Sequence, residues 1–330
     1  MSRLAALFFA LSSGAALAAE CTGTDLLATM PEADRSELLA RAAEKPFPEG
    51  ILWRAEKDGR TIHLVGTMHL FDPRHEATLE RVTPMIEASG TVFLEMAEGD
   101  EARLQQMIAE KPSLAFITEG PTLPDLMAED DWQALKDAMT ERGMPGFMTA
   151  KMKPWMAMAN LAFSRCDLVN IQAGKTGLDG MIIDRAIALG KPAVALEPID
   201  TAFNIFAEYT LDEQIDMLRL TLLQQMGSAT DMSHTTVSAY FREEVQLIWE
   251  FSLAQAELTA DVSPEELDAQ IAKIEELLLT RRNRAWMEPI LASDTDDVIA
   301  VGALHLPGED GLLALLEVEG FTITRLPLAP

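Results

Sequence analysis

Leu64-Val65-Gly66-Thr67-Met68-His69 and Val301-Gly302-Ala303-Leu304-His305 are the two stretches that decide the fold of this chain. In each, a glycine follows an apolar run, and a histidine stands three residues after that glycine. Short apolar runs bounded by glycine are typical of buried strands. The chain contains five histidines, and two of them occupy this one pattern. We therefore expect two buried strands that each deliver an imidazole beyond their ends.

Two further apolar runs end in a carboxylate instead of a histidine: Thr91-Val92-Phe93-Leu94-Glu95 and Ala193-Val194-Ala195-Leu196-Glu197. In open α/β sheets, the ligand crevice lies beyond the carboxyl ends of the strands. Four strands that share a direction would therefore bring both histidines and both glutamates to one rim of the sheet.

Imidazole nitrogens together with carboxylate oxygens suit a divalent ion such as zinc, manganese or cobalt, and also iron(II). A metal at this rim would lower the pKa of a bound water to about 7 and polarise a carbonyl group, as hydrolysis of an amide or ester requires. The sequence thus predicts a metal site made of His69, Glu95 and His305, with Glu197 acting on the water.

A plainer explanation exists for each of these residues. A histidine after a strand commonly makes a hydrogen bond in a turn, a glutamate there commonly caps the next helix, and a glycine permits a tight turn. The matched repetition of the pattern favours the site over these explanations. The remaining histidines are weaker candidates: His63 within a strand, His234 at a polar helix start, and His75, which would at most support the site.

A predicted helix before the second motif carries Arg282, Asn283 and Trp286. The guanidinium and amide groups of the first two residues would serve catalysis by stabilising a developing oxyanion or by holding a substrate carboxylate. An ion pair between Arg282 and one of the many acidic residues is the competing explanation. Methionines also recur at helical spacing, where core packing is favoured over an adaptable peptide groove; they are Met144, Met148, Met152, Met156 and Met158.

The rest of the chain is mostly helical by its pattern of apolar residues. A hairpin is predicted at residues 51–65, because two strand-like runs are joined by Asp58-Gly59, a favoured two-residue turn. A last strand is expected at 321–326. Helices are expected at 31–43, 76–88, 178–189, 211–225, 237–254 and 264–278, with several more between 100 and 165. The predicted fold is a helix-rich α/β domain with a central mixed sheet and a long helical insertion.

The N-terminus has the features of a signal peptide at residues 1–18: one arginine, a short apolar run, and Ala16-Leu17-Ala18 as a cleavage site. We therefore expect a single exported domain at residues 19–330, periplasmic or secreted, with no membrane-spanning segment after cleavage. An oxidising compartment favours a disulfide between the two cysteines, Cys21 and Cys166. The alternative is two partly buried thiols. Zinc binding by cysteine is not expected, because no Cys-x-x-Cys spacing exists.

The composition limits the partners. The chain has 330 residues, 48% of them hydrophobic, and a formal net charge of −27. A field of this sign repels phosphate backbones and anionic lipid, which argues against nucleic-acid binding. The negative charge is explained most simply as a solvated surface, and attraction of cationic peptides or metal ions is the alternative. The expected partner is a peptide or a small molecule.

The same motifs resemble those of the TraB/PrgY/GumN family. Leu52-Trp53-Arg54 followed by residues 64–70 and Asp72-Pro73-Arg74-His75 is similar to the family's opening signature. Residues 301–313, preceded by Arg282, Asn283 and Trp286, are similar to its closing signature. Shorter matches lie at Lys153-Pro154-Trp155, Gly177-Leu178-Asp179 and Leu196-Glu197. The resemblance spans residues 46–326, although Met68 replaces the usual isoleucine and residues 76–79 lack prolines common in close relatives.

The resemblance implies a fold related to TIKI proteins and to erythromycin-esterase-like and ChaN-like proteins. TIKI proteins are metal-dependent peptidases that use two Gly-x-x-His motifs and acidic residues. By that likeness His69 and His305 are the metal-site histidines, with Glu95 and Glu197 as acidic partners. The expected function is an exported metal-dependent, peptidase-like hydrolase. One alternative is a periplasmic protein that sequesters a peptide or other ligand without cleaving it, and another is a structural site beside an acidic partner surface.

Overall fold

The computed structural model describes residues 23–260 and 262–328, apart from the side chains of residues 202 and 225–228. The predicted signal peptide at 1–18 and Cys21 of the predicted disulfide lie outside the described residues. Cys166 lies at the start of α9 (Arg165–Gln172).

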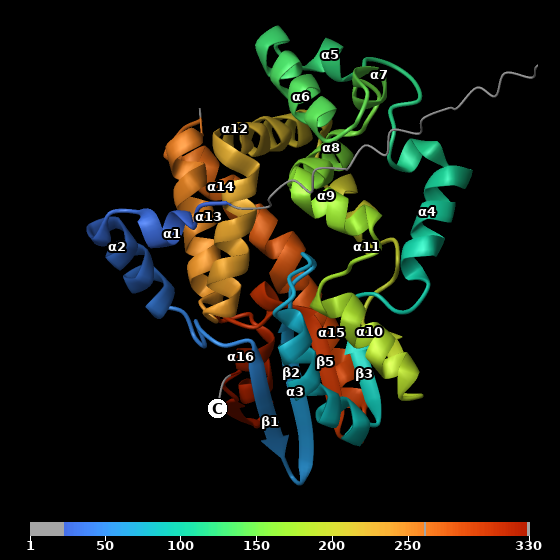
Figure 1. Cartoon of the computed structure of the whole chain (residues 1–330), viewed down its shortest axis with the longest axis vertical. Helices are drawn as coiled ribbons and strands as arrows, with labels where there is room; N and C mark the ends of the chain where they lie inside the picture. The colour runs from blue at the N-terminus through green and yellow to red at the C-terminus, as the bar shows by residue number, and fades with distance from the viewer. Residues whose placement is uncertain (1–22, 261, 329–330) are drawn as a thin grey trace, which may run out of the picture.

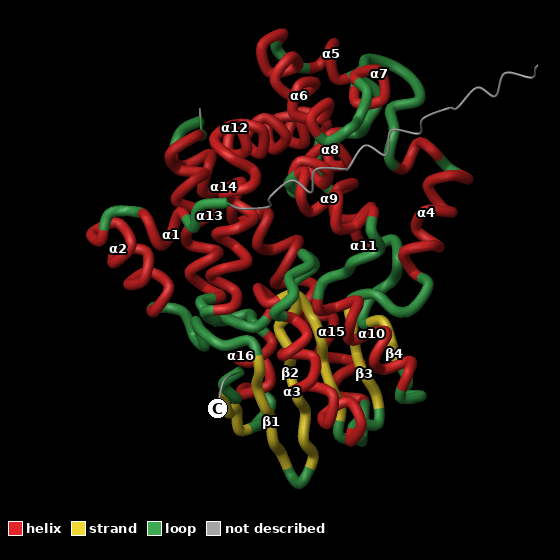
Figure 2. Tube along the Cα trace, in the orientation of Figure 1, coloured by secondary structure: helices red, strands yellow, loops and turns green. Residues whose placement is uncertain are grey.

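A six-stranded mixed sheet forms the centre of the lower part of the molecule in Figures 1 and 2. Its strand order is β4-β3-β5-β2-β1-β6. The first four strands in this order are parallel, and β1 is antiparallel to both of its neighbours. The predicted mixed sheet is therefore confirmed. The strands are β1 (Leu52–Lys57), β2 (Arg60–Thr67), β3 (Thr91–Leu94), β4 (Ala193–Ala195), β5 (Asp297–Gly302) and β6 (Thr322–Arg325).

The predicted hairpin is present between β1 and β2. Asp58 has φ of +51° and Gly59 has φ of +86°, as a turn with two left-handed central residues requires. The turn pairs Lys57 with Arg60 and so sets the register of the two strands. This register buries Ile62 and Leu64 on one face of the sheet.

The sheet is covered on both faces, which explains why its central strands read as unbroken apolar runs. On β5, Val298 and Ala300 pack into one core cluster, whereas Ile299 and Val301 pack into the other. Helices α3 (His75–Ala88) and α10 (Leu178–Ala188) supply the first cluster. Helices α15 (Arg281–Ala292) and α16 (Leu312–Val318) supply the second.

A second body of helices lies beyond the carboxyl ends of the parallel strands (Figure 2). It comes from the segment between β3 and α10 and from the long segment between β4 and α15, so the predicted helical insertion is present. Among the described residues, no helix has the length and apolar character needed to cross a membrane. The remaining helices are α1 (Leu26–Thr29), α2 (Glu32–Ala43), α4 (Asp100–Glu110), η1 (Pro112–Leu114), α5 (Leu123–Leu126), α6 (Glu129–Glu141), α7 (Gly146–Thr149), α8 (Pro154–Leu161), α9, α11 (Thr201–Ala207), α12 (Leu211–Phe241), α13 (Val245–Thr259), α14 (Pro264–Glu275), the π turn η2 (Glu276–Thr280) and η3 (Ala303–His305).

One predicted boundary is wrong. The patterns at 211–225 and 237–254 were expected to be separate helices, but α12 runs without interruption from Leu211 to Phe241. The break comes afterwards at Glu243, whose φ is +62°. Tyr240 and Val245, on either side of this break, pack into the same core cluster. The pattern of apolar residues therefore continues across the break, so the pattern alone does not reveal where the helix ends.

Most of the five methionines at helical spacing are packing residues, as predicted. Met152 and Met158 are buried in the core of the helical body, and Met144 and Met156 pack against that core. Met148 differs, because 38% of its surface is exposed.

Candidate functional site

The carboxyl ends of the four parallel strands meet at one rim. The register pairs Thr67 with Gly302 and Leu94 with Ala300, and Leu94 pairs with Ala195 on its other side. The segments that carry His69, Glu95, Glu197 and His305 all begin at these ends. The four strands therefore share a direction, which the sequence by itself left open.

Arg282 lies at the centre of this rim. Its Nη2 donates to Glu95 Oε2 at 2.6 Å and to Glu197 Oε1 at 2.7 Å. Its Nε donates to Glu197 Oε2 at 2.8 Å, and its Nη1 lies 3.2 Å from His305 Nε2. Burial alone would lower the pKa of Arg282, but the two carboxylates raise it above its ordinary value. We call Glu95, Glu197, Arg282, Asn283 and His305 the rim cluster.

His305 is held as a neutral imidazole with a defined tautomer. Its Nδ1 lies 2.6 Å from Asn283 Oδ1, while Asn283 Nδ2 donates to the backbone oxygen of Asp310 at 2.8 Å. Since an amide oxygen only accepts, Nδ1 carries the proton and Nε2 keeps its lone pair toward Arg282. Burial, with Arg282 nearby, lowers the pKa of His305 to about 4. The Trp286 ring packs against this imidazole at 4.5 Å between centroids.

The two carboxylates of the rim cluster are both anchored. Glu95 Oε1 accepts from the backbone N–H of Gly302 at 2.6 Å, so it binds the second motif directly. Burial opposes the charged form of Glu95, but His305, which is protonated at the low pH where Glu95 titrates, Arg282, His69 and this N–H together lower the pKa of Glu95 to about 2. Glu197 Oε2 also accepts from Trp286 Nε1 at 3.2 Å. Both oxygens of Glu197 are therefore already engaged.

His69 lies on the same rim but forms no hydrogen bond with the rim cluster. Its Nδ1 lies 3.0 Å from Asp179 Oδ2, and 64% of its side chain is exposed. The hydrogen bond to Asp179 outweighs desolvation and raises the pKa of His69 to about 9, with a smaller contribution from Glu95. Sequence reasoning did not identify Asp179 as a site residue. Its position in the first turn of a helix that follows Gly177 was the available signal.

The loop that carries His69 packs tightly on the start of α10. The backbone N–H of Leu178 donates to the backbone oxygen of Met68 at 2.9 Å. A Cβ atom at Gly177 would lie 2.1 Å from that oxygen and 2.5 Å from the backbone carbon of His69. Only glycine allows this approach without moving the backbone.

Gly177→Ala is expected to lower the free energy of unfolding by about 1–3 kcal/mol, because the new methyl group forces the His69 loop away from α10. Urea denaturation measures this change. Gly146→Ala is the matched control, since its Cβ would meet only the flexible side chain of Lys136 at 3.1 Å. Equal stability losses in the two variants would contradict this account of Gly177.

A π turn sets the direction of Arg282 and Asn283. The turn η2 ends at Thr280, immediately before α15, and Arg282 Nη1 donates back to the oxygen of Leu278 at 3.1 Å. Inserted π turns rotate the following residues relative to a regular helix and are frequent at functional sites. On α15, which follows this turn, Asn283 and Trp286 are buried, whereas Arg284 is exposed.

The three weaker histidines occupy three different settings. His75 is fully buried, its Nε2 lies 3.0 Å from the backbone oxygen of Leu70, and its ring packs against Tyr240 and Phe241. It therefore supports the loop after His69, as the sequence allowed. His63 lies within β2, as expected. His234 lies inside α12, so the prediction that it stands at a helix start is wrong.

The predicted metal ligands are only partly brought together. His305 Nε2 lies 3.8 Å from Glu95 Oε1, and Arg282 donates to both residues. His69 remains bound to Asp179 at the edge of the rim. Within the described residues, no three histidine, cysteine, aspartate or glutamate side chains are arranged to hold a metal ion. The prominent feature of the rim is a guanidinium between two carboxylates.

Comparison with known proteins agrees with the motifs. The family model described as the TraB/PrgY/gumN family matches residues 51–325. This range includes both Gly-x-x-His motifs and every residue of the rim cluster. No curated protein matches the chain significantly.

Proposed function

This chain belongs to the TraB/PrgY/gumN family, and on that premise we propose that it is an exported metal-dependent hydrolase that acts on peptide bonds. The observation that carries the proposal is the meeting of His305, Glu95 and Arg282 at the carboxyl ends of parallel strands, beside His69. Export is supported by the sequence pattern at residues 1–18, and the Cys21–Cys166 disulfide is part of the same proposal.

The chemistry of the donor atoms fits a divalent ion. His305 Nε2 has a free lone pair because Asn283 holds the proton on Nδ1, and such support is typical of metal-bound histidines. Glu95 is ionised. These two residues and His69 would hold zinc, manganese or cobalt, provided that Arg282 gives up its contacts with Glu95 and His305. When bound, such an ion supplies an activated water and polarises the substrate carbonyl.

The remaining side chains have distinct roles in this proposal. Asp179 holds the Nδ1 side of the His69 ring, so that Nε2 would be the nitrogen that binds the ion. Arg282 stabilises negative charge that develops on the carbonyl oxygen. Glu197 holds Arg282 with both oxygens, and it acts on water only after it releases one of these bonds.

The decisive experiment combines metal analysis with a peptide-cleavage screen of the purified chain. His69→Ala and His305→Ala are each expected to lower bound metal and to reduce turnover by about 10²–10⁴-fold, because each removes a ligand or proton-transfer group. His63→Ala, on the same strand as the first motif, is the matched control and should keep both properties. Undiminished activity in both test variants would end this assignment.

A non-catalytic protein that sequesters a peptide or other ligand is the second candidate. It is favoured by the guanidinium of Arg282, which fills the space between Glu95 and Glu197 where the hydrolase would hold its metal ion. Ligand binding without cleavage, in the presence of each of the three metals, would support this candidate over the hydrolase.

A further inference from the structure

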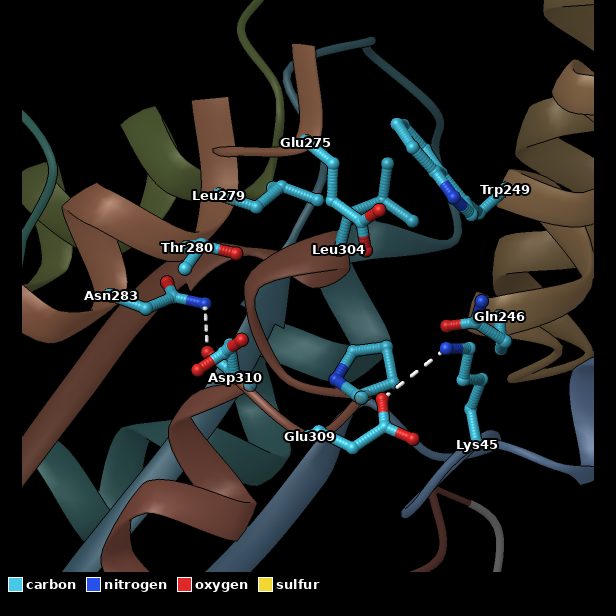
Figure 3. A pocket seen from close by; sticks show the side chains of 13 residues that line it. Lys45, Gln246, Trp249, Glu275, Leu279, Thr280, Asn283, Leu304, Glu309 and Asp310 are labelled. Carbon is cyan, nitrogen blue, oxygen red and sulfur yellow. Dashed lines mark hydrogen bonds and ion pairs between the residues drawn. The ribbon is translucent and has the colours of Figure 1, made fainter. Parts of the chain in front are cut away.

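A cavity of about 50 Å³ adjoins the rim cluster, because Asn283 is one of its walls and also holds His305. Figure 3 shows the cavity. A buried water needs about 10–15 Å³ of such space, so the cavity is large enough for a single head group. Its walls come from Lys45 after α2, from α13, from the end of α14 with η2, and from the loop after His305; they include Gln246, Trp249, Glu275, Thr280 and Glu309.

The amide oxygen of Gln246 is directed into this cavity. Gln246 Nε2 donates to Glu250 Oε1 at 3.1 Å, and Glu250 Oε2 accepts from Arg41 at 2.9 Å. Because a carboxylate paired with arginine only accepts, the amide nitrogen must face Glu250 and the amide oxygen must face away from it. Figure 3 shows that oxygen toward the cavity. Gln246 is 6% exposed, and its oxygen has no hydrogen-bond partner among the described residues.

Two more oxygen acceptors line the same space. Thr280 is 8% exposed, and its hydroxyl has no hydrogen-bond partner within the part of the chain that the structure describes. Glu275, on the same wall as Thr280, brings a carboxylate to the cavity (Figure 3). Glu309 is neutralised by Lys45 at 3.3 Å and Asp310 by Arg284 at 2.8 Å. Glu275 has no such cation among the described residues, so it leaves the cavity with a net negative charge.

These acceptors, with the indole of Trp249 beside them, are the groups that bind a cation. An ammonium group has three donors and no acceptor, and it is also attracted to the face of a tryptophan ring. An anion would meet the Glu275 carboxylate and the two uncharged acceptors, because Lys45 in the wall is already paired with Glu309. We propose that this cavity binds a primary ammonium group, supplied by a lysine side chain or by the amino terminus of a peptide. The proposal concerns binding and holds whether or not the rim cluster hydrolyses a bond.

Three small probes test the proposal by saturation-transfer NMR titration of the purified chain. Nα-acetyl-lysine amide offers a side-chain ammonium, alanyl-alanine amide offers an α-ammonium, and Nα-acetyl-norleucine amide has neither. At least one ammonium probe is expected to bind about tenfold more tightly than the norleucine probe, since hydrogen bonds to charged groups are the strong ones. The tighter of the two identifies the source of the ammonium. Equal binding of all three probes, or binding of none, would overturn the proposal.

Variants distinguish binding in this cavity from general electrostatic attraction of a cation to an acidic protein. Glu275 is exposed, so the Glu275→Gln variant should fold normally. It is nevertheless expected to weaken binding of the ammonium probe about tenfold. Gln246→Leu should weaken it as well. Glu265→Gln makes the same charge change on the same helix, at an exposed position away from the cavity, and should leave binding unchanged. The same weakening in Glu265→Gln and Glu275→Gln would refute the site.

Discussion

Arg282→Met is expected to lower the free energy of unfolding by about 3–5 kcal/mol, the cost of breaking a buried ion pair by removal of one partner. Arg282 is 16% exposed and donates to Glu95, Glu197 and His305. Its loss leaves two carboxylates, 16% and 13% exposed, close together without a cation. The desolvation of those charges is then uncompensated, and this penalty exceeds the apolar packing that methionine regains.

Urea denaturation of the purified variant measures this loss. Arg284→Met is the matched control, because Arg284 lies on the same helix and its ion pair with Asp310 has side-chain exposures of 61% and 40%; its effect should stay below about 1 kcal/mol. Adding Glu197→Gln to Arg282→Met should recover part of the stability, because one buried charge is removed. A loss no larger than that of Arg284→Met would show that the rim cluster does not depend on Arg282.

Trp286→Ala is expected to cost about 3–5 kcal/mol, in the range found for large core side chains truncated to alanine. Trp286 is fully buried in the core cluster between α15, α16 and the sheet. Its Nε1 donates to Glu197, and its ring packs on His305. The change therefore leaves a cavity and also frees one acceptor of the rim cluster.

Thermal and urea unfolding of Trp286→Ala should be compared with Trp286→Phe. Phenylalanine keeps most of the ring volume but removes the N–H donor, so its cost should be nearer to 1–3 kcal/mol, about that of one unsatisfied buried acceptor. If both variants cost the same, the hydrogen bond to Glu197 and not the packing would be the dominant contribution.

Much of the sheet could be predicted because its signals are local. The apolar runs before Gly66 and Gly302 and the Asp58-Gly59 turn each depend on neighbours in the sequence, and all appear as strands or as the turn. Covered faces make parallel strands apolar throughout, so their length and flanking glycines identify them. The carboxyl-end position of both histidines and both glutamates followed from the shared strand direction.

Other features could not be predicted, because they depend on partners distant in the chain. Arg282 was expected to stabilise charge, with an ion pair as the alternative, but the sequence does not reveal that it bonds Glu95, 187 positions away, and Glu197 together. Asp179 belongs to a short motif whose sequence suggests no role, and only its distance to His69 reveals one. The continuous α12 was missed because the apolar period carries over its true end.

The sequence by itself determined the strands, the hairpin, the family and the identity of the side chains at the rim, since each depends on local pattern or short motifs. Only the tertiary structure decided which of those side chains bond one another. It placed a guanidinium between two carboxylates, paired His69 with Asp179, and left a small acidic cavity behind Asn283. The physical reason is that hydrogen bonds and desolvation act through space over a few ångströms, and no sequence separation encodes that distance.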